Sequence, residues 1–154
     1  AGWTAGGIGY AWRALIKFDL SSIPQNAIIK GAKISLYSTP TPYQGNGVDA
    51  QYGSANAGYI QRIVSNWNGS TVNWNTQPST DATHQVTIPQ SSSSFEDNLN
   101  LDVTELIKDI LANSNYGFLI RLQNEVPYNT RQYASSFHAD PTKHPKLIVY
   151  YELP

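Results

Sequence analysis

The sequence contains no cysteine and no methionine among its 154 residues. Without cysteine there is no disulfide framework, no thiol chemistry and no metal site with cysteine ligands. Charged residues make up only 14% of the chain, and the net charge is −1 with no long run of either sign. A nucleic-acid-binding domain normally carries a basic stripe, so we expect no nucleic-acid partner. No apolar run approaches the ~20 residues that a membrane-spanning helix needs, so we expect no membrane insertion.

Uncharged polar residues and tyrosine are abundant where other proteins have charged residues, and 40% of the chain is hydrophobic. The length suits one domain with its own core, and we expect a single domain over residues 1–154. A surface wetted by hydroxyl and amide groups is typical of a β-rich extracellular domain, so we expect a secreted or cell-surface location. The chain also lacks an initiator methionine and a signal peptide, which indicates a mature fragment or an excised domain.

The clearest structural signal is the segment RALIKFDLSSIPQNAIIKGAKISLY, residues 13–37. Two stretches, 14–18 and 32–37, alternate in character with a period of two, which is the mark of a half-buried strand. Serine and proline between them favour a turn. The residues expected to face the core are Ala14, Ile16, Phe18, Ala32, Ile34 and Leu36.

The rest of the chain predicts further strands and one helix. Strands are expected at 58–64, 84–88, 99–103, 118–122, 131–134 and 147–152, which gives eight or nine strands in all. In DVTELIKDILANSNYG the period changes to that of a helix, with Asp102 and Glu105 resembling a capping box. Its expected apolar stripe is Leu106, Ile107, Ile110 and Leu111. We therefore predict an all-β fold, a jelly-roll-like antiparallel β-sandwich with one short α-helix.

Two segments do not fit this pattern of strands. Residues 1–10 are rich in glycine and carry no charge, and we expect them to be flexible. Residues 38–59 are rich in Pro, Gly, Asn and Ala, which predicts a long loop. Loops of this length in a compact domain are more often functional than idle.

Five segments that occur in order carry a resemblance to a known family: RALIKFDLSSIP, IIKGAKISLY, VSNWNGSTVNWNTQPS, LDVTELIKDIL and YASSFHADPTKHPKLIVYY. Over residues 13–151 the chain resembles the DNRLRE-type domain of bacterial secreted and surface proteins. Some relatives serve as carbohydrate-binding modules, including ones attached to alginate lyases. The resemblance implies a jelly-roll-like sandwich and a non-catalytic role. Relatives usually have one more strand before the segment that matches Trp12 and Arg13.

Tyrosines are the best candidates for contacts with a ligand. Their rings offer an apolar platform with a polar edge, and a nearby arginine can pair with a uronate carboxylate. The alternative is that a secreted β-domain is simply rich in tyrosine. The candidate ligand-binding residues are Tyr43, Tyr52, Tyr59, Arg131 and Tyr133. We therefore expect a polysaccharide-binding module.

Other chemistry finds less support in the sequence. Hydrolysis of a glycosidic bond needs two carboxylates roughly 5–10 Å apart, and the acidic residues lie mostly beside turns or on the helix, so we expect no enzyme. We expect Trp67 and Trp74 to pack under a loop, with their N–H groups bonded locally. Asp49 and Asp81 lie in expected loops and are candidate ligands for a structural Ca²⁺. No dense ligand loop is present, so calcium stays an open alternative.

A structural role is the rival function. A sandwich without a full set of strands exposes unpaired N–H and C=O groups at a sheet edge, which invites pairing with another chain. The chain would then be a building block of a surface fibre or adhesive stalk. Its partners would be other copies of itself or a neighbouring domain.

Overall fold

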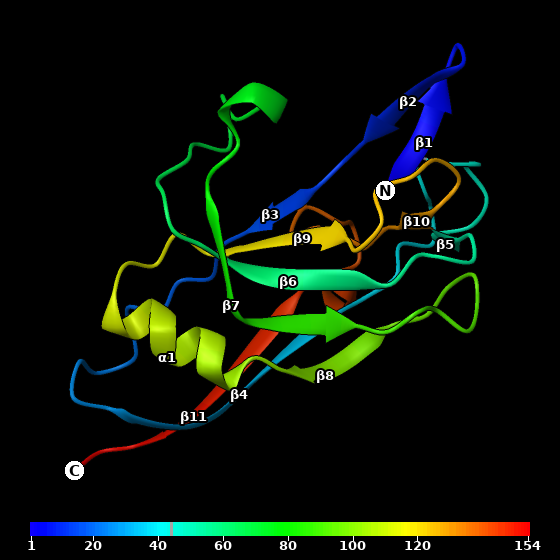
Figure 1. Cartoon of the computed structure of the whole chain (residues 1–154). Helices are drawn as coiled ribbons and strands as arrows, with labels where there is room; N and C mark the ends of the chain where they lie inside the picture. Colours follow the sequence, from blue (N-terminus) through cyan, green and yellow to red (C-terminus); the bar gives the residue numbers. More distant parts are fainter. Residues whose placement is uncertain (44) are drawn as a thin grey trace.

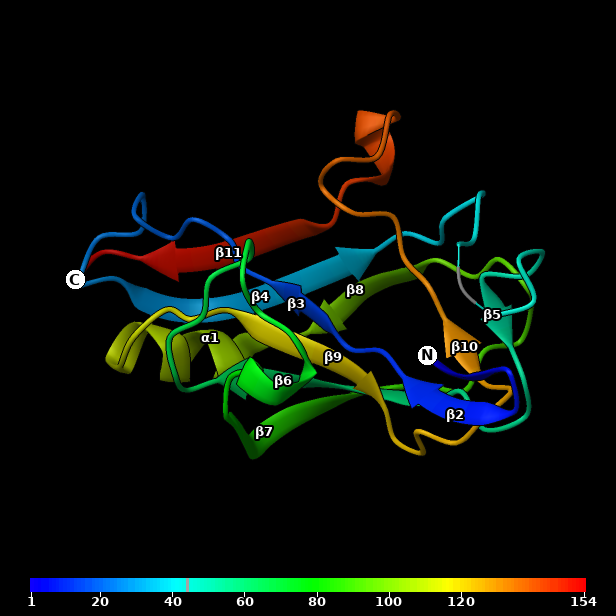
Figure 2. The same ribbon diagram turned by 90° about the horizontal axis from the view of Figure 1, so that it is seen from above.

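Two antiparallel sheets face each other across a hydrophobic core in the computed structural model, which describes residues 1–43 and 45–154 (Figures 1 and 2). The four-stranded sheet runs in the order β3 (Ala14–Ile16), β9 (Phe118–Leu122), β6 (Gly58–Ile63) and β7 (Thr80–Ile88). The three-stranded sheet runs in the order β11 (Lys146–Glu152), β4 (Ile28–Leu36) and β8 (Asn98–Asp102). The predicted all-β sandwich is confirmed.

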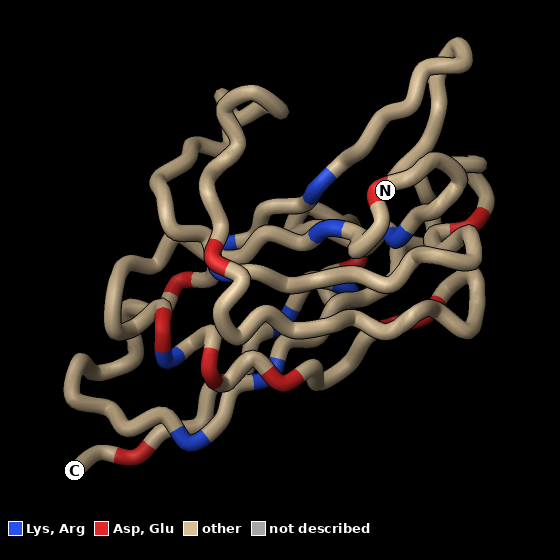
Figure 3. Tube along the Cα trace, viewed as in Figure 1, with Lys and Arg blue, Asp and Glu red and all other residues tan. Residues whose placement is uncertain are grey.

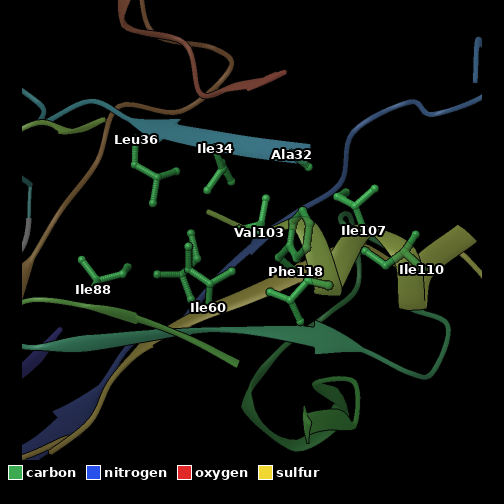
Figure 4. Close-up of a cluster of buried hydrophobic side chains, with 11 residues drawn as sticks. Ala32, Ile34, Leu36, Ile60, Ile88, Val103, Ile107, Ile110 and Phe118 are labelled. Carbon is green, nitrogen blue, oxygen red and sulfur yellow. The ribbon is translucent and has the colours of Figure 1, made fainter. Parts of the chain in front are cut away.

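The core lies between the two sheets and is closed at one end by the helix (Figure 4). As predicted, Ala32, Ile34 and Leu36 point into it from β4. Its other buried members are Ile60, Ile88, Val103, Leu106, Ile107, Ile110, Phe118 and Ile120. Ala14, however, is exposed, because β3 is a short edge strand that pairs only with β9 in the described chain.

The helix α1 (Thr104–Ala112) lies where its apolar period predicts it. Leu106, Ile107 and Ile110 are buried, whereas Leu111 is exposed at the margin of the stripe. The expected capping box is wrong, because the N-cap is Val103 and makes no side-chain bond. Asp102 instead accepts from the backbone and hydroxyl of Thr104.

The N-terminal segment is a β-hairpin, which corrects the expectation of a flexible stretch. Strands β1 (Gly2–Ala5) and β2 (Ile8–Ala11) pair through a turn in which Gly6 and Gly7 both have positive φ. Gly2 bridges to Asn129, and a side chain at Gly2 would stand 2.2 Å from the Val126 carbonyl oxygen. This close approach anchors the hairpin to the body of the sandwich.

Two arms therefore rise from the same side of the four-stranded sheet (Figure 1). The first arm is the β1–β2 hairpin, and the second is the loop 65–79 with a 3₁₀ turn, η1 (Trp74–Thr76). Neither arm contains a charged residue, and Figure 3 shows Lys and Arg interspersed with Asp and Glu over the sandwich below. The arms are thus polar and aromatic surfaces above a charged body.

The remaining elements are short. Strands β5 (Gln51–Tyr52) and β10 (Thr130–Arg131) pair with each other, and η2 (Pro141–Lys143) precedes β11. The strand expected at 131–134 is therefore shorter and shifted. Counting these pieces, the described residues form eleven strands rather than eight or nine. None of the described helices has the length and apolar character needed to cross a membrane.

We predict that Gly117→Ala destabilises the fold more than Gly47→Ala does. Both glycines have positive φ, 86° and 70° respectively, so both variants carry the left-handed strain of about 1–2 kcal/mol. Only at Gly117 would the new Cβ stand 2.2 Å from the Ile16 carbonyl oxygen, where β3 meets β9. Denaturant unfolding should show a loss of about 2–4 kcal/mol for Gly117→Ala. Equal losses in the two variants would contradict this packing of β3.

Candidate functional site

A hollow of about 1430 Å³ opens between the two arms and is called the groove below. The second strand of the hairpin, β3 and the loop 67–77 form its walls, and Leu119 of β9 lies among its lining residues. Phe137 and Pro145, from the segment before β11, close one side. The groove thus brings together segments from both ends and the middle of the chain.

Aromatic rings dominate the exposed walls of the groove. Tyr10 and Trp12 lie with their ring centroids 6.0 Å apart and their planes 28° from parallel. Trp74 across the groove is 52% exposed, and Phe137 is 95% exposed. Large apolar rings open to solvent at a concave site are typical of ligand contacts rather than of core packing.

Arg13 at the floor of the groove holds these walls in place. Its Nε and Nη2 donate to the two carboxylate oxygens of Glu125 at 2.7 and 2.6 Å, and Nη1 donates to Gln77 Oε1 at 2.7 Å. The guanidinium also lies over the Trp74 ring, 4.7 Å from its centroid. A bidentate pair of this kind has a fixed geometry, so Arg13 orients Trp74 as well as Glu125.

The loop around Trp74 has its own local support. Asn73 caps η1 by accepting from the Asn75 backbone N–H, and Thr76 Oγ1 accepts in return from the Asn73 N–H. Gln77 Nε2 donates to the Trp74 carbonyl oxygen at 2.9 Å. The indole of Trp74 is therefore presented on a turn whose polar groups are paired.

Glu125 stays ionised in this setting. Burial alone would raise its pKa, but the hydrogen bond and charge of Arg13 outweigh burial and hold the pKa below its usual value. A carboxylate that is already paired with a guanidinium on both oxygens has little capacity to take up a proton.

The two tryptophans of the loop differ in role. Trp67 is half-buried, as predicted, but its indole N–H donates to the Tyr116 carbonyl oxygen at 2.7 Å, 49 residues along the chain, and not to a local partner. The prediction that Trp74 packs under the loop is wrong, because its ring faces the groove. Sequence reasoning also missed Tyr10, Trp12 and Arg13. The available signal was the alternation of the two rings, Tyr10 and Trp12, just before the alternating residues 14–18.

The structure scatters the five candidate ligand residues over several places. Tyr43 is 90% exposed and lines a second hollow of about 520 Å³, which Arg131 and Tyr133 also border. Tyr52 packs edge-on against Trp3, with centroids 5.6 Å apart. Tyr59 belongs to β6 rather than to the long loop, and it lies under the Arg121 guanidinium.

Arg131 is 8% exposed and lies inside a polar cluster. Its guanidinium donates to the carbonyl oxygens of Asn56 and Pro89, to the side-chain oxygens of Asn56 and Asn98, and to the Tyr133 hydroxyl. Tyr133 donates to Asn98 in turn, and burial raises the pKa of Tyr133 to about 12. These internal partners occupy a guanidinium that was expected to reach a ligand.

The candidate calcium ligands lie in different elements. Asp81 is in β7, not in a loop as expected, where it accepts from the Thr83 N–H and from Arg62. The Thr83 backbone bond is the largest of the contacts that lower the Asp81 pKa to about 2. Asp49 accepts from the Asn46 side chain. Within residues 1–43 and 45–154 no three His, Asp or Glu side chains gather as a metal site would require.

The comparison with protein families gives one finding. The sequence model of carbohydrate-binding module family 96 matches residues 3–151, nearly the whole chain and including both arms. Comparison with curated proteins and with solved structures finds no match.

We predict that Arg131→Met destabilises the domain by about 3–5 kcal/mol, because buried acceptors on Asn56, Asn98 and Pro89 lose their donor. Lys30→Met, which removes an exposed cation paired with Glu152, should cost less than about 1 kcal/mol. Urea unfolding followed by tryptophan fluorescence measures both. A fully stable Arg131→Met protein would mean that the cluster is not a structural requirement.

Proposed function

Because the chain belongs to carbohydrate-binding module family 96, we propose that it binds a polysaccharide in the groove between its two arms and catalyses no reaction on it. The observation that carries this proposal is the set of exposed rings of Tyr10, Trp12 and Trp74 around one hollow. The apolar C–H face of a sugar ring is complementary to such a platform, and amide and guanidinium groups beside it can meet the hydroxyl groups.

Preorganisation supports the groove over the other aromatic surfaces. Trp74 is held by the Arg13 guanidinium and by the capped turn beneath it, so little conformational freedom is lost when a sugar docks. Tyr52 and Tyr128, by contrast, both pack edge-on against Trp3, which takes up part of their ring surface.

The charges around the groove favour an acidic polysaccharide. Arg13 and Lys17 line it, and Glu125 is the only acid among its described lining residues. Arg13 and Glu125 neutralise each other, whereas Lys17 is exposed and has no ion-pair partner in the described chain. The one uncompensated cation that remains among the described residues of the groove, on a chain of net charge −1, suits a polymer of uronate units.

A non-catalytic role is proposed from the same lining. Hydrolysis of a glycosidic bond uses a pair of carboxylates, whereas Glu125 stands alone among the described residues that line the two hollows. Both of its oxygens already accept from Arg13. Secretion or display at a cell surface is part of this proposal, because the uncharged polar surface and a polysaccharide ligand both fit an extracellular setting.

We predict that Trp74→Ala weakens binding to a polyuronate about tenfold or more, because it removes a central aromatic contact. The measurement is affinity electrophoresis and calorimetry with alginate and polygalacturonate, beside neutral xylan. Phe95→Ala, which removes an exposed ring that lines neither hollow, is the matched control and should bind normally. Added salt should weaken polyuronate binding.

Two results would count against the proposal. A folded Trp74→Ala protein that binds as tightly as the original would remove the groove as the site. If the chain bound none of the three polymers, the proposal that it binds a polysaccharide of these kinds would be wrong.

A structural role is a second candidate, favoured by the open edge of β11. In the described part of the chain β11 pairs with β4 alone, so its outer backbone groups are free to bond. Ile148 and Tyr150 on this strand are exposed. We propose that two copies can pair edge to edge through β11, which would satisfy these groups and bury the apolar side chains.

Sedimentation over a range of concentrations tests this pairing. We expect a concentration-dependent dimer or longer assembly for the original chain and a monomer for Ile148→Lys, because a charge on an edge strand opposes pairing. A monomer at all concentrations for the original chain would contradict the edge proposal and would leave polysaccharide binding untouched.

A further inference from the structure

The second hollow, of about 520 Å³, lies beside the groove, and the two share part of their walls. The residues common to both linings are Trp12, Arg13, Leu15, Ile16, Ser136, Phe137 and Pro145. One side of this shared wall is the edge strand β3, and the other is the segment before β11, on which Phe137 stands exposed.

The second hollow repeats the chemistry of the groove, with hydroxyl and amide side chains beside an exposed ring. Thr39, Thr41 and Gln132 line it, and Tyr43 is the most exposed of the rings that line this hollow alone. The Tyr43 backbone N–H donates to Gln132 Oε1 at 3.1 Å, which ties the loop that carries Tyr43 to the segment after β10. An exposed ring on a tethered backbone beside hydroxyl groups is again a surface that suits a sugar.

The combined size exceeds the need of a small ligand. Pockets for a single small molecule have volumes of about 300–1,000 Å³, whereas the groove alone has about 1430 Å³. The adjoining hollow extends it past a ring, Phe137, that is 95% exposed. A ligand that filled both would have to be an extended chain of several units.

We infer that the groove and the second hollow form one continuous site, which an extended segment of a polysaccharide chain fills completely and a short oligosaccharide fills only in part. The chain stacks on Tyr10, Trp12 and Trp74 in the groove, passes Phe137, and continues onto Tyr43 in the second hollow. This inference rests on the proposed polysaccharide-binding function and adds the length of chain that the site takes.

A continuous site has a consequence that a short site lacks. Each unit added to an oligosaccharide makes further contacts until both hollows are occupied, and the affinity rises with length over that range. Tyr43 contributes only when the ligand is long enough to reach the second hollow. Trp74 contributes for every length, because it lies in the groove where the short ligands bind.

The experiment is calorimetry with size-fractionated alginate oligosaccharides from disaccharide to decasaccharide. We expect the affinity of the original chain to rise over the series and then level off. Tyr43→Ala should weaken the longest oligosaccharides about threefold to tenfold and leave the shortest unchanged. Phe95→Ala, which removes an exposed ring in neither lining, is the control and should match the original chain at every length.

Failure of the inference and failure of the proposed function look different. If the disaccharide binds as tightly as the decasaccharide and Tyr43→Ala has no effect at any length, the continuous site is excluded while polysaccharide binding stands. If Tyr43→Ala weakens short and long ligands alike, the two hollows are not filled in sequence, and the inference fails. If neither alginate oligosaccharides nor the polymer bind, the inference is wrong, and so is the proposal that alginate is a ligand of this chain.

Discussion

The Arg13 guanidinium joins three segments that are distant in the sequence, and the candidate site depends on it. Glu125 follows β9, Gln77 lies in the second arm, and Arg13 itself lies between the hairpin and β3. Without this cation the carboxylate of Glu125 would be partly buried without compensation, and the loop of Trp74 would lose its bond through Gln77. The position of Trp74 in the groove therefore depends on a guanidinium that a bidentate ion pair holds in a fixed geometry.

A second arginine plays the complementary part below the surface. Arg131 gathers the chain near Asn56, Pro89 and Asn98 into one buried cluster, and it thereby joins the short strand β10 to the ends of β7 and β8. That cluster supports the wall of the second hollow, which Arg131 and Tyr133 border. One arginine thus positions the exposed Trp74 ring of the groove, and the other stabilises the adjoining wall from within.

The sequence predicted the strands and the helix that a regular spacing of apolar residues reveals. It failed where contacts between distant segments determine whether a side chain is buried. Ala32, Ile34 and Leu36 alternate without interruption, so their burial followed from pattern alone. The exposure of Trp74 and the burial of Arg131 did not, because each depends on residues more than forty positions away. The usual preference places arginine at the surface and tryptophan in the interior. Here the hydrogen bonds of its guanidinium allow Arg131 to be buried, and a capped turn holds Trp74 exposed. The hairpin was missed because glycine-rich segments carry little periodic signal.

The central claim is that the aromatic groove between the arms is the sugar-binding surface, and the four tryptophans report on it directly. In a titration with alginate, the indole N–H signals in two-dimensional NMR should move for Trp12 and Trp74, which line the groove with exposed rings. The Trp3 N–H, which belongs to the other aromatic cluster and lines neither hollow, should stay in place. Movement of Trp3 while Trp12 and Trp74 stay unchanged would contradict the account.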